Sequence, residues 1–237
     1  MIIVIDIGHG GYDNGAVNNS IKEKDLNLIY GQLIAAILGD YAEVKLTRDS
    51  DIYFGLNSRG AWINAQNPDL IISCHFNACD TKAHGTEIIH SIHADQSILR
   101  LCDKIAKGIT DIGFDLRRVF SRSSNIMPSK DYYAIIRNTK APCIIIEPCF
   151  MDNDHDKVIM SGVGFMGQLA LNISNAIIDH YKLQKVNQLN ITDAAALLQR
   201  HKIINSPDYW AKGLVYNPDY VRQLIVNMAE YLKDKEV

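Results

Sequence analysis

The stretch Ile2-Ile3-Val4-Ile5-Asp6-Ile7-Gly8-His9-Gly10-Gly11 decides how this sequence folds. Its first six residues are almost continuously apolar, which is typical of a strand that is covered on both faces. The glycines that follow break the strand and indicate a loop. His9 therefore stands just beyond the carboxyl end of a buried strand, which is where open α/β sheets place their ligands.

Two further apolar runs end in the same way. Residues 70–74 form a buried run that leads directly into His75, and residues 143–146 form another that ends at Glu147. Because the carboxyl ends of parallel strands meet at one edge of a sheet, we expect the side chains of His9, His75 and Glu147 to lie close together.

The segments between these runs alternate between helical and strand-like patterns, which predicts an α/β fold. We expect a twisted, mostly parallel or mixed sheet that is flanked by helices. The predicted helices are residues 23–38, 56–66, 95–112 and 164–181, and the predicted further strands are residues 43–47 and, at an edge, 86–90. Residues 113–130 are polar and irregular, and we expect them to form a loop over the site.

The pattern changes near the carboxyl terminus. We assign residues 1–181 to one catalytic domain and residues 182–189 to a polar linker. Residues 190–237 read as a small all-α module, because Ser206-Pro207 and Asn217-Pro218 each place a capping residue before a proline at a first helical position.

Composition excludes several classes of protein. The chain has 237 residues and a formal net charge of -3, so no strong attraction to nucleic acid or to anionic membranes is expected. No apolar run approaches the roughly 20 residues that would span a bilayer. The first residues lack a basic leader and a cleavage site, so we expect no signal peptide and synthesis in the cytoplasm. The cysteines are odd in number and lack CxxC spacing, which favours free thiols over disulfides: Cys74, Cys79, Cys102, Cys143 and Cys149.

Two imidazoles and one carboxylate form a zinc shell that leaves a fourth position open for water. His9 and His75 supply the imidazoles, and Glu23, at the start of the first long helix, can reach the same edge. Zinc lowers the pKa of its water to about 7 and polarises a carbonyl oxygen. Glu147 ends a hydrophobic strand, where burial raises the pKa of a carboxyl group, so it suits the role of proton acceptor. The expected reaction is hydrolysis of an amide.

Each of these residues also has a purely structural interpretation. A single histidine after a strand is more often structural than a ligand. Glu23 lies beside Lys24 and Asp25 and fits a solvated first helical turn. Glu147 fits an ion-paired carboxylate at a strand end. The functional interpretation rests on the ordered set rather than on any one residue.

That ordered set resembles the zinc N-acetylmuramoyl-L-alanine amidases of the Amidase_3 type, which occur among phage endolysins, sporulation hydrolases and cell-division amidases. The resemblance covers roughly residues 1–181 and is carried by these matches: Gly8-His9-Gly10-Gly11, Asp13, Gly15, Glu23, Asn27, Thr47-Arg48, Asp51, Leu56, Arg59, Asn64, Ser73, His75, Asn77, Ala78, Gly85-Thr86-Glu87, Glu147, Phe150 and Asn153. Cys149 and Phe76 depart from the family pattern, which often has glycine at the first position and a smaller residue at the second.

The resemblance implies that His9, Glu23 and His75 are the zinc ligands and that Glu147 is the catalytic carboxylate. Asn77 either orients a ligand or binds substrate. The implied reaction is cleavage of the amide bond between N-acetylmuramic acid and L-alanine in bacterial peptidoglycan. Two alternatives remain: a zinc peptidase that cleaves within the stem peptides, and a non-catalytic cell-wall-binding protein.

Without a signal peptide, the expected setting is a phage endolysin that reaches the cell wall after release from the cytoplasm. The helical module of residues 190–237 is expected to serve wall targeting or self-association.

Other residues are expected to be structural. Arg48 and Arg59 should brace the fold through carboxylate pairs. His90 and His93 offer another pair of imidazoles, but their spacing suits a surface loop better than a metal site. Cys74 should point away from His75 on its strand and pack in the core.

Overall fold

The computed structural model describes residues 1–185, 199–200 and 203–204. The chain divides into two compact units, Met1–Val186 and Asn187–Val237. The description below concerns the first unit. Half of the predicted linker (residues 186–189) and almost all of the predicted helical module lie outside the described residues.

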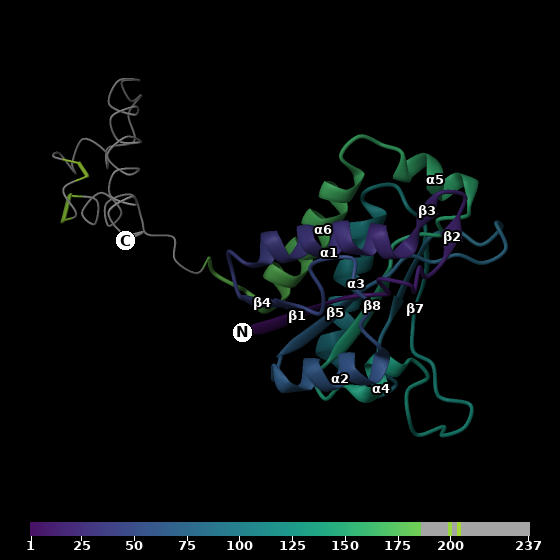
Figure 1. Cartoon of the computed structure of the whole chain (residues 1–237), viewed down its shortest axis with the longest axis horizontal. Helices are drawn as coiled ribbons and strands as arrows, with labels where there is room; N and C mark the ends of the chain where they lie inside the picture. The colour runs from purple at the N-terminus through teal and green to yellow at the C-terminus, as the bar shows by residue number, and fades with distance from the viewer. Residues whose placement is uncertain (186–198, 201–202, 205–237) are drawn as a thin grey trace. The chain divides into compact units, whose positions relative to one another are not determined.

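A six-stranded mixed sheet forms the centre of this unit (Figure 1). Its strands are β1 (Ile2–Ile7), β4 (Glu43–Leu46), β5 (Leu70–Cys74), β6 (Thr86–Ile89), β7 (Leu116–Phe120) and β8 (Cys143–Glu147). Their order across the sheet is β4-β1-β5-β8-β6-β7. The first four of these run parallel to one another, β6 is antiparallel to β8, and β7 is parallel to β6. The predicted α/β class is therefore confirmed.

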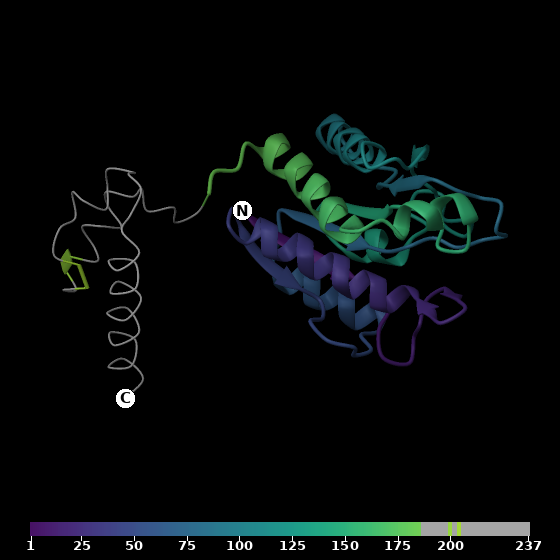
Figure 2. The ribbon, with the colours of Figure 1, turned by 90° about the horizontal axis from the view of Figure 1, so that it is seen from above.

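Helices cover both faces of the sheet. The helices are α1 (Glu23–Leu38), α2 (Leu56–Ala65), α3 (Gln96–Thr110), α4 (Ala134–Asn138), α5 (Asp154–Met160) and α6 (Phe165–Tyr181). Figure 1 shows α1, α3 and α6 on one side of the sheet and α2 and α4 on the other. Figure 2 shows α1 and α6 lying alongside each other over the sheet.

The apolar strands fit this three-layer arrangement because their side chains alternate between the two faces. On β1, Ile3, Ile5 and Ile7 belong to the core beneath α1, α3 and α6, whereas Val4 belongs to the core beneath α2 and α4. All four side chains are fully buried. Nearly continuous apolar character is thus what a strand in the middle of this sheet requires.

Two expectations about the sheet edge were wrong. Residues 86–90 were expected at an edge, but β6 lies between β8 and β7. Residues 113–130 were expected to be a loop throughout, but they contain β7, which is one of the two edge strands of the sheet. The sequence Leu116-Arg117-Arg118-Val119-Phe120 has no clear apolar alternation, because an edge strand with exposed arginines buries little of either face.

The start of α1 is fixed by a short hairpin of β2 (Val17–Asn18) and β3 (Ile21–Lys22). Lys22 precedes the helix and provides no side-chain cap. Glu23, the first residue of α1, instead accepts a hydrogen bond at 2.8 Å from the backbone N–H of Ala16, which precedes the hairpin. The hairpin therefore places the Glu23 carboxylate beside the loop that follows β1.

Candidate active site

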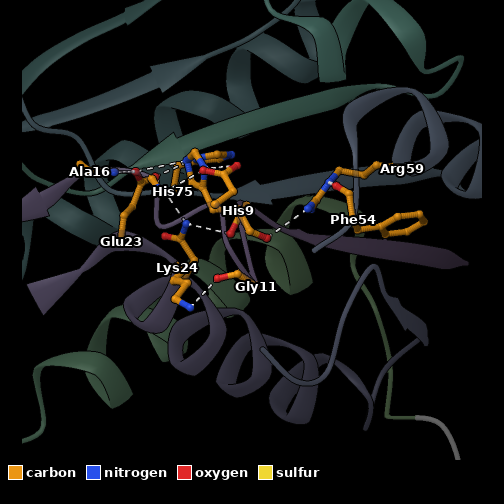
Figure 3. Close-up of polar contacts among 12 residues, drawn as sticks. His9, Gly11, Ala16, Glu23, Lys24, Phe54, Arg59 and His75 are labelled. Carbon is orange, nitrogen blue, oxygen red and sulfur yellow. Dashed lines mark hydrogen bonds and ion pairs between the residues drawn. The ribbon is translucent and has the colours of Figure 1, made fainter. Parts of the chain in front are cut away.

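Three side chains from separate elements converge at the carboxyl edge of the sheet. His9 follows β1, His75 follows β5 and Glu23 begins α1. The Glu23 carboxylate lies between the two imidazoles, at 3.2 Å from Nε2 of His9 and 2.9 Å from Nδ1 of His75 (Figure 3). One ligand atom from each residue falls within 4.8 Å of the others. In the described part of the chain, no other group of three such side chains has this geometry.

The backbone leaves room for this cluster at two glycines. A Cβ atom on Gly8 would lie 2.3 Å from the His75 ring, and one on Gly15 would lie 2.4 Å from Oε2 of Glu23. Gly15 also has a φ of +63°, in the region that favours glycine. His9 itself has a φ of 61°, which is uncommon for a residue with a side chain. The loop therefore holds His9 in a conformation that the surrounding contacts must enforce.

A carboxylate orients the first histidine. Nδ1 of His9 donates a hydrogen bond to Oδ2 of Asp13 at 2.9 Å, which leaves Nε2 facing Glu23. Metal-binding histidines commonly donate their second ring N–H to a carboxylate in this way, because the bond fixes both the tautomer and the ring orientation. Asp13 also accepts a bond from the backbone N–H of Gly15, so it shapes the loop as well.

Two buried arginines brace the backbone of the loop. Arg48 donates to the carbonyl oxygens of Ile7 and Gly8. Arg59 donates to the carbonyl oxygens of Ile7 and His9 and forms an ion pair with Asp6. The bracing predicted for Arg59 thus includes the expected carboxylate pair, whereas Arg48 acts on backbone carbonyls.

Lys24 extends this bracing on the other side of the loop. Its Nζ donates to the carbonyl oxygen of Gly11 (Figure 3). The same Nζ donates to the carboxylate of Asp51. Lys24 is buried, although the sequence suggested a solvated helical turn. Its neighbour Glu23 is buried too.

The charges in the cluster stabilise one another. Burial alone would raise the pKa of Glu23, but the hydrogen bonds from His75 and His9 hold it well below its ordinary value. Burial alone would lower the pKa of His9, but Glu23 and Asp13 raise it. An ionised carboxylate between two imidazoles is a donor set that suits a divalent metal ion, and the space beside it is open to a cavity.

The cavity has a volume of about 340 Å³ and lies on the α2 and α4 side of the sheet. His9 and His75 line it, as do Glu147 at the end of β8 and the aromatic rings of Phe54 and Tyr133. Oε2 of Glu147 is buried and has no hydrogen-bond partner. Burial raises the pKa of Glu147 well above its ordinary value, and the negative charges of Glu23 and Glu87 raise it further. A carboxyl group in this state is suited to proton transfer.

Asn77 does not line this cavity, but it contacts a residue that lies next to Glu147. Its Nδ2 donates to Oε2 of Glu87 at 3.0 Å, and its Oδ1 accepts from the backbone N–H of Ala78. Glu87 lies opposite Glu147 in the register of β6 and β8. Asn77 therefore orients an acidic side chain beside Glu147.

Sequence reasoning gave no role to several residues at this site. Asp13 and Glu87 stand within the matched motifs, and the spacing of Asp13 four residues after His9 was a usable signal. Tyr53 and Tyr133 line the cavity but follow no motif, so no sequence signal points to them. The other candidate ligands lie elsewhere: His93 lines a separate cavity of about 430 Å³, and Cys74 is buried in the core.

The chain is similar to several known proteins. A family model described as N-acetylmuramoyl-L-alanine amidase (Amidase_3) matches residues 3–179. The endolysin of Bacillus phage SPP1 is 31% identical over 193 residues, which cover 78% of this chain and 67% of the endolysin.

Two solved structures extend the comparison. The amidase AmiC2 of Nostoc punctiforme is 26% identical with a TM-score of 0.66, and the match covers 77% of this chain and 97% of AmiC2. Cwp6 from Clostridium difficile is 28% identical with a TM-score of 0.71, over 76% of this chain and 29% of Cwp6.

Proposed function

Because the chain belongs to the N-acetylmuramoyl-L-alanine amidase family and has this activity on peptidoglycan, we propose that it acts with a zinc ion held by His9, Glu23 and His75. The observation that carries the proposal is the convergence of these three donors, within 4.8 Å of one another, beside a cavity that contains Glu147. Imidazole nitrogen and carboxylate oxygen are ligands that zinc takes in catalytic sites with an open fourth position.

A zinc ion bound here supplies Lewis-acid chemistry, since it lowers the pKa of a water molecule and polarises the carbonyl oxygen of the substrate. The chain's own residues supply the rest. The Glu147 carboxylate accepts a proton from the attacking water and delivers it to the nitrogen of L-alanine as the C–N bond breaks. The products are the carboxylate of the muramic acid lactyl group and a stem peptide with a free amine.

Supporting residues hold this arrangement in place. Asp13 keeps Nδ1 of His9 occupied, so that only Nε2 is free to bind the metal. We keep Asn77 as the proposed substrate-binding residue: Glu87 fixes its amide beside the cavity, where a substrate that extends beyond the cavity would meet it. Both roles depend on hydrogen bonds that are already formed before the metal or the substrate binds.

Product analysis tests the proposal. We expect the chain to release intact stem peptides with new L-alanine amino groups from purified peptidoglycan, as measured by mass spectrometry. Glu147→Gln should bind zinc in a one-to-one ratio yet release almost no peptide. His75→Ala should lose both zinc and activity. Wild-type turnover by Glu147→Gln would contradict the assignment of the catalytic carboxylate.

We further propose that the chain is a phage endolysin, made in the cytoplasm, that acts on the wall after release. Its 31% identity to a phage endolysin supports this setting. Within the described residues, no helix combines the length and apolar character needed to cross a bilayer.

We propose that residues 190–237 target the wall or mediate self-association. Deletion of residues 187–237 should reduce co-sedimentation with purified walls, or reduce the mass measured by light scattering, while zinc content stays unchanged. If neither quantity changes, this segment has neither role.

A further inference from the structure

Two exposed arginines, Arg118 on β7 and Arg122 just after it, stack on aromatic rings. The guanidinium carbon of Arg118 lies 3.9 Å from the centroid of the Phe120 ring, and that of Arg122 lies 3.8 Å from the centroid of the Tyr132 ring. Both arginines are exposed. A planar guanidinium that stacks on a ring is preoriented, so it loses less conformational freedom when its N–H groups bind a ligand.

This region carries excess positive charge. Arg117 and Arg118 each donate through Nε to the same oxygen of Glu87, at 2.9 Å. One carboxylate therefore faces two guanidinium groups, so these three side chains together carry a net positive charge. Among the described residues, Arg122 forms no ion pair. Guanidinium groups of this kind bind carboxylates in two-point contacts.

The positive charge lies at one rim of the active-site cavity. Tyr133 lines the cavity together with Glu147. Burial and the charge of Glu147 raise the pKa of the Tyr133 hydroxyl, whereas the charges of Arg122 and Arg118 lower it. The contacts place both arginines there: Arg122 stacks on Tyr132, whose ring centroid lies 5.1 Å from that of Tyr133. Arg118 bonds to Glu87, which lies opposite Glu147 in the register of β6 and β8.

The opposite rim has a different chemistry. Tyr12 and Tyr53 stack with ring centroids 4.1 Å apart, and Tyr53 lines the cavity beside His9. Both tyrosines are exposed. These rings stand next to the loop after β1, whereas the arginines belong to the β7 edge, so β5, β8 and β6 separate the two rims. An aromatic surface suits uncharged sugar rings, and a cationic surface suits the carboxylates of a stem peptide.

We propose that Arg118 and Arg122 form a subsite that binds a free carboxylate of the stem peptide, on the peptide side of the cleaved bond. The inference rests on the proposed active site, because it uses the position of Glu147 to orient the substrate. It implies a substrate preference. The chain should cleave stem peptides with a free carboxylate on the second residue faster than stem peptides with a carboxamide at that position.

Two muropeptides that differ only in this group, carboxylate or carboxamide on the residue after L-alanine, test the inference. We expect the wild-type kcat/KM to be about tenfold higher for the carboxylate form, which is the usual size of one charge-assisted contact. Arg118→Gln and Arg122→Gln should each raise KM for the carboxylate form severalfold and leave kcat largely unchanged. Arg118→Lys should keep part of the preference.

Arg117→Gln is the matched control. It removes the same kind of bond to Glu87, but the Arg117 side chain stands over the Phe150 ring instead of near Tyr133. It should therefore keep the tenfold preference. Equal wild-type rates on the two muropeptides, or the same loss in Arg117→Gln as in Arg118→Gln, would overturn the subsite. Failure of the active site itself would look different, because no stem peptide with a free L-alanine amine would be released from either muropeptide, and both proposals would fall.

Discussion

His9 illustrates how single residues are constrained at this site. Its backbone lies in the left-handed region, and its two ring nitrogens face Asp13 and Glu23. The strain that this conformation costs, on the order of 1–3 kcal/mol, must be offset by the surrounding contacts. Asp13, Arg59 and the tight approach of Gly15 provide them.

Removal of Asp13 should weaken metal binding without removing a ligand. We expect Asp13→Ala to lower zinc affinity by roughly 10- to 100-fold, since loss of the carboxylate partner of a metal-binding histidine typically costs this much. Competition with a chromophoric chelator would measure it. Asp13→Asn, which can still accept the Gly15 bond, should show a smaller loss. If the zinc affinity of Asp13→Ala matched that of the wild type, Asp13 would have no role in orienting His9.

Ionised Glu147 should destabilise the folded protein, because Oε2 of its carboxylate is buried without a hydrogen-bond partner. Its folded-state pKa is raised, so the folded state holds this proton more tightly than the unfolded state does. Metal-free wild-type protein should therefore lose stability relative to metal-free Glu147→Gln as the pH rises above the ordinary carboxyl pKa. The difference should grow by up to about 1.4 kcal/mol per pH unit until the folded-state pKa is passed.

Urea unfolding of both metal-free proteins at several pH values measures this difference. The two proteins should be similar in stability at the lowest pH values, where Glu147 is protonated in both the folded and the unfolded state. A difference that does not vary with pH would show that Glu147 ionises as easily in the folded protein as in the unfolded chain.

At the scale of elements, the ion pair between Asp6 and Arg59 joins β1 to α2. Both side chains are buried. Asp6 also accepts hydrogen bonds from Thr47, which follows β4, and Ser73 on β5. Burial alone would raise the pKa of Asp6, but Arg59 and Ser73 hold it below its ordinary value. Asp6 and Arg59 therefore tie three neighbouring strands and a helix together beneath the loop that follows β1.

Arg59→Met should destabilise the protein by about 3–5 kcal/mol, because it leaves a buried carboxylate unpaired. The free energy of unfolding in urea would show this. Adding Asp6→Asn to Arg59→Met should recover part of the loss, since the two residues are in direct contact. Purely additive losses in the double variant would mean that the pair contributes no coupling.

How far the sequence predicts the elements depends on their burial. β1, β5 and β8 were predicted because both of their faces are covered, which requires long apolar runs. β7 was missed because Arg117 and Arg118 are exposed at the sheet edge. α4 and α5 were missed because each is only five to seven residues long and buries few side chains.

The site was predictable in part for the same reason. His9 and His75 follow buried strands and Glu147 ends one, so sheet geometry alone brings them to one edge. Glu23 reaches that edge through the hairpin of β2 and β3, whose two-residue strands leave no pattern in the sequence. Tyr53 and Tyr133 come from connecting segments, and their place at the cavity depends on the packing of α2 and α4 on the sheet.

At the scale of the whole molecule, the parallel strands bring the site residues together. The order of the strands places two different surfaces on opposite sides of the site. β1, β5 and β8 bring His9, His75 and Glu147, the proposed metal-binding and catalytic groups, to one edge of the sheet. The aromatic rim lies toward β1 and the cationic rim toward β7, which suits a substrate with a sugar chain on one side of the cleaved bond and an acidic peptide on the other.

Zinc back-titration tests the central claim most directly. The chain is stripped with a chelator, zinc is added in measured steps, and release of L-alanine amino groups from peptidoglycan is followed. Activity should be almost absent at the start, rise in proportion to added zinc, and level off at one ion per chain. Full turnover by the stripped protein, in the continued presence of chelator, would contradict the claim that His9, Glu23 and His75 work by holding a metal ion.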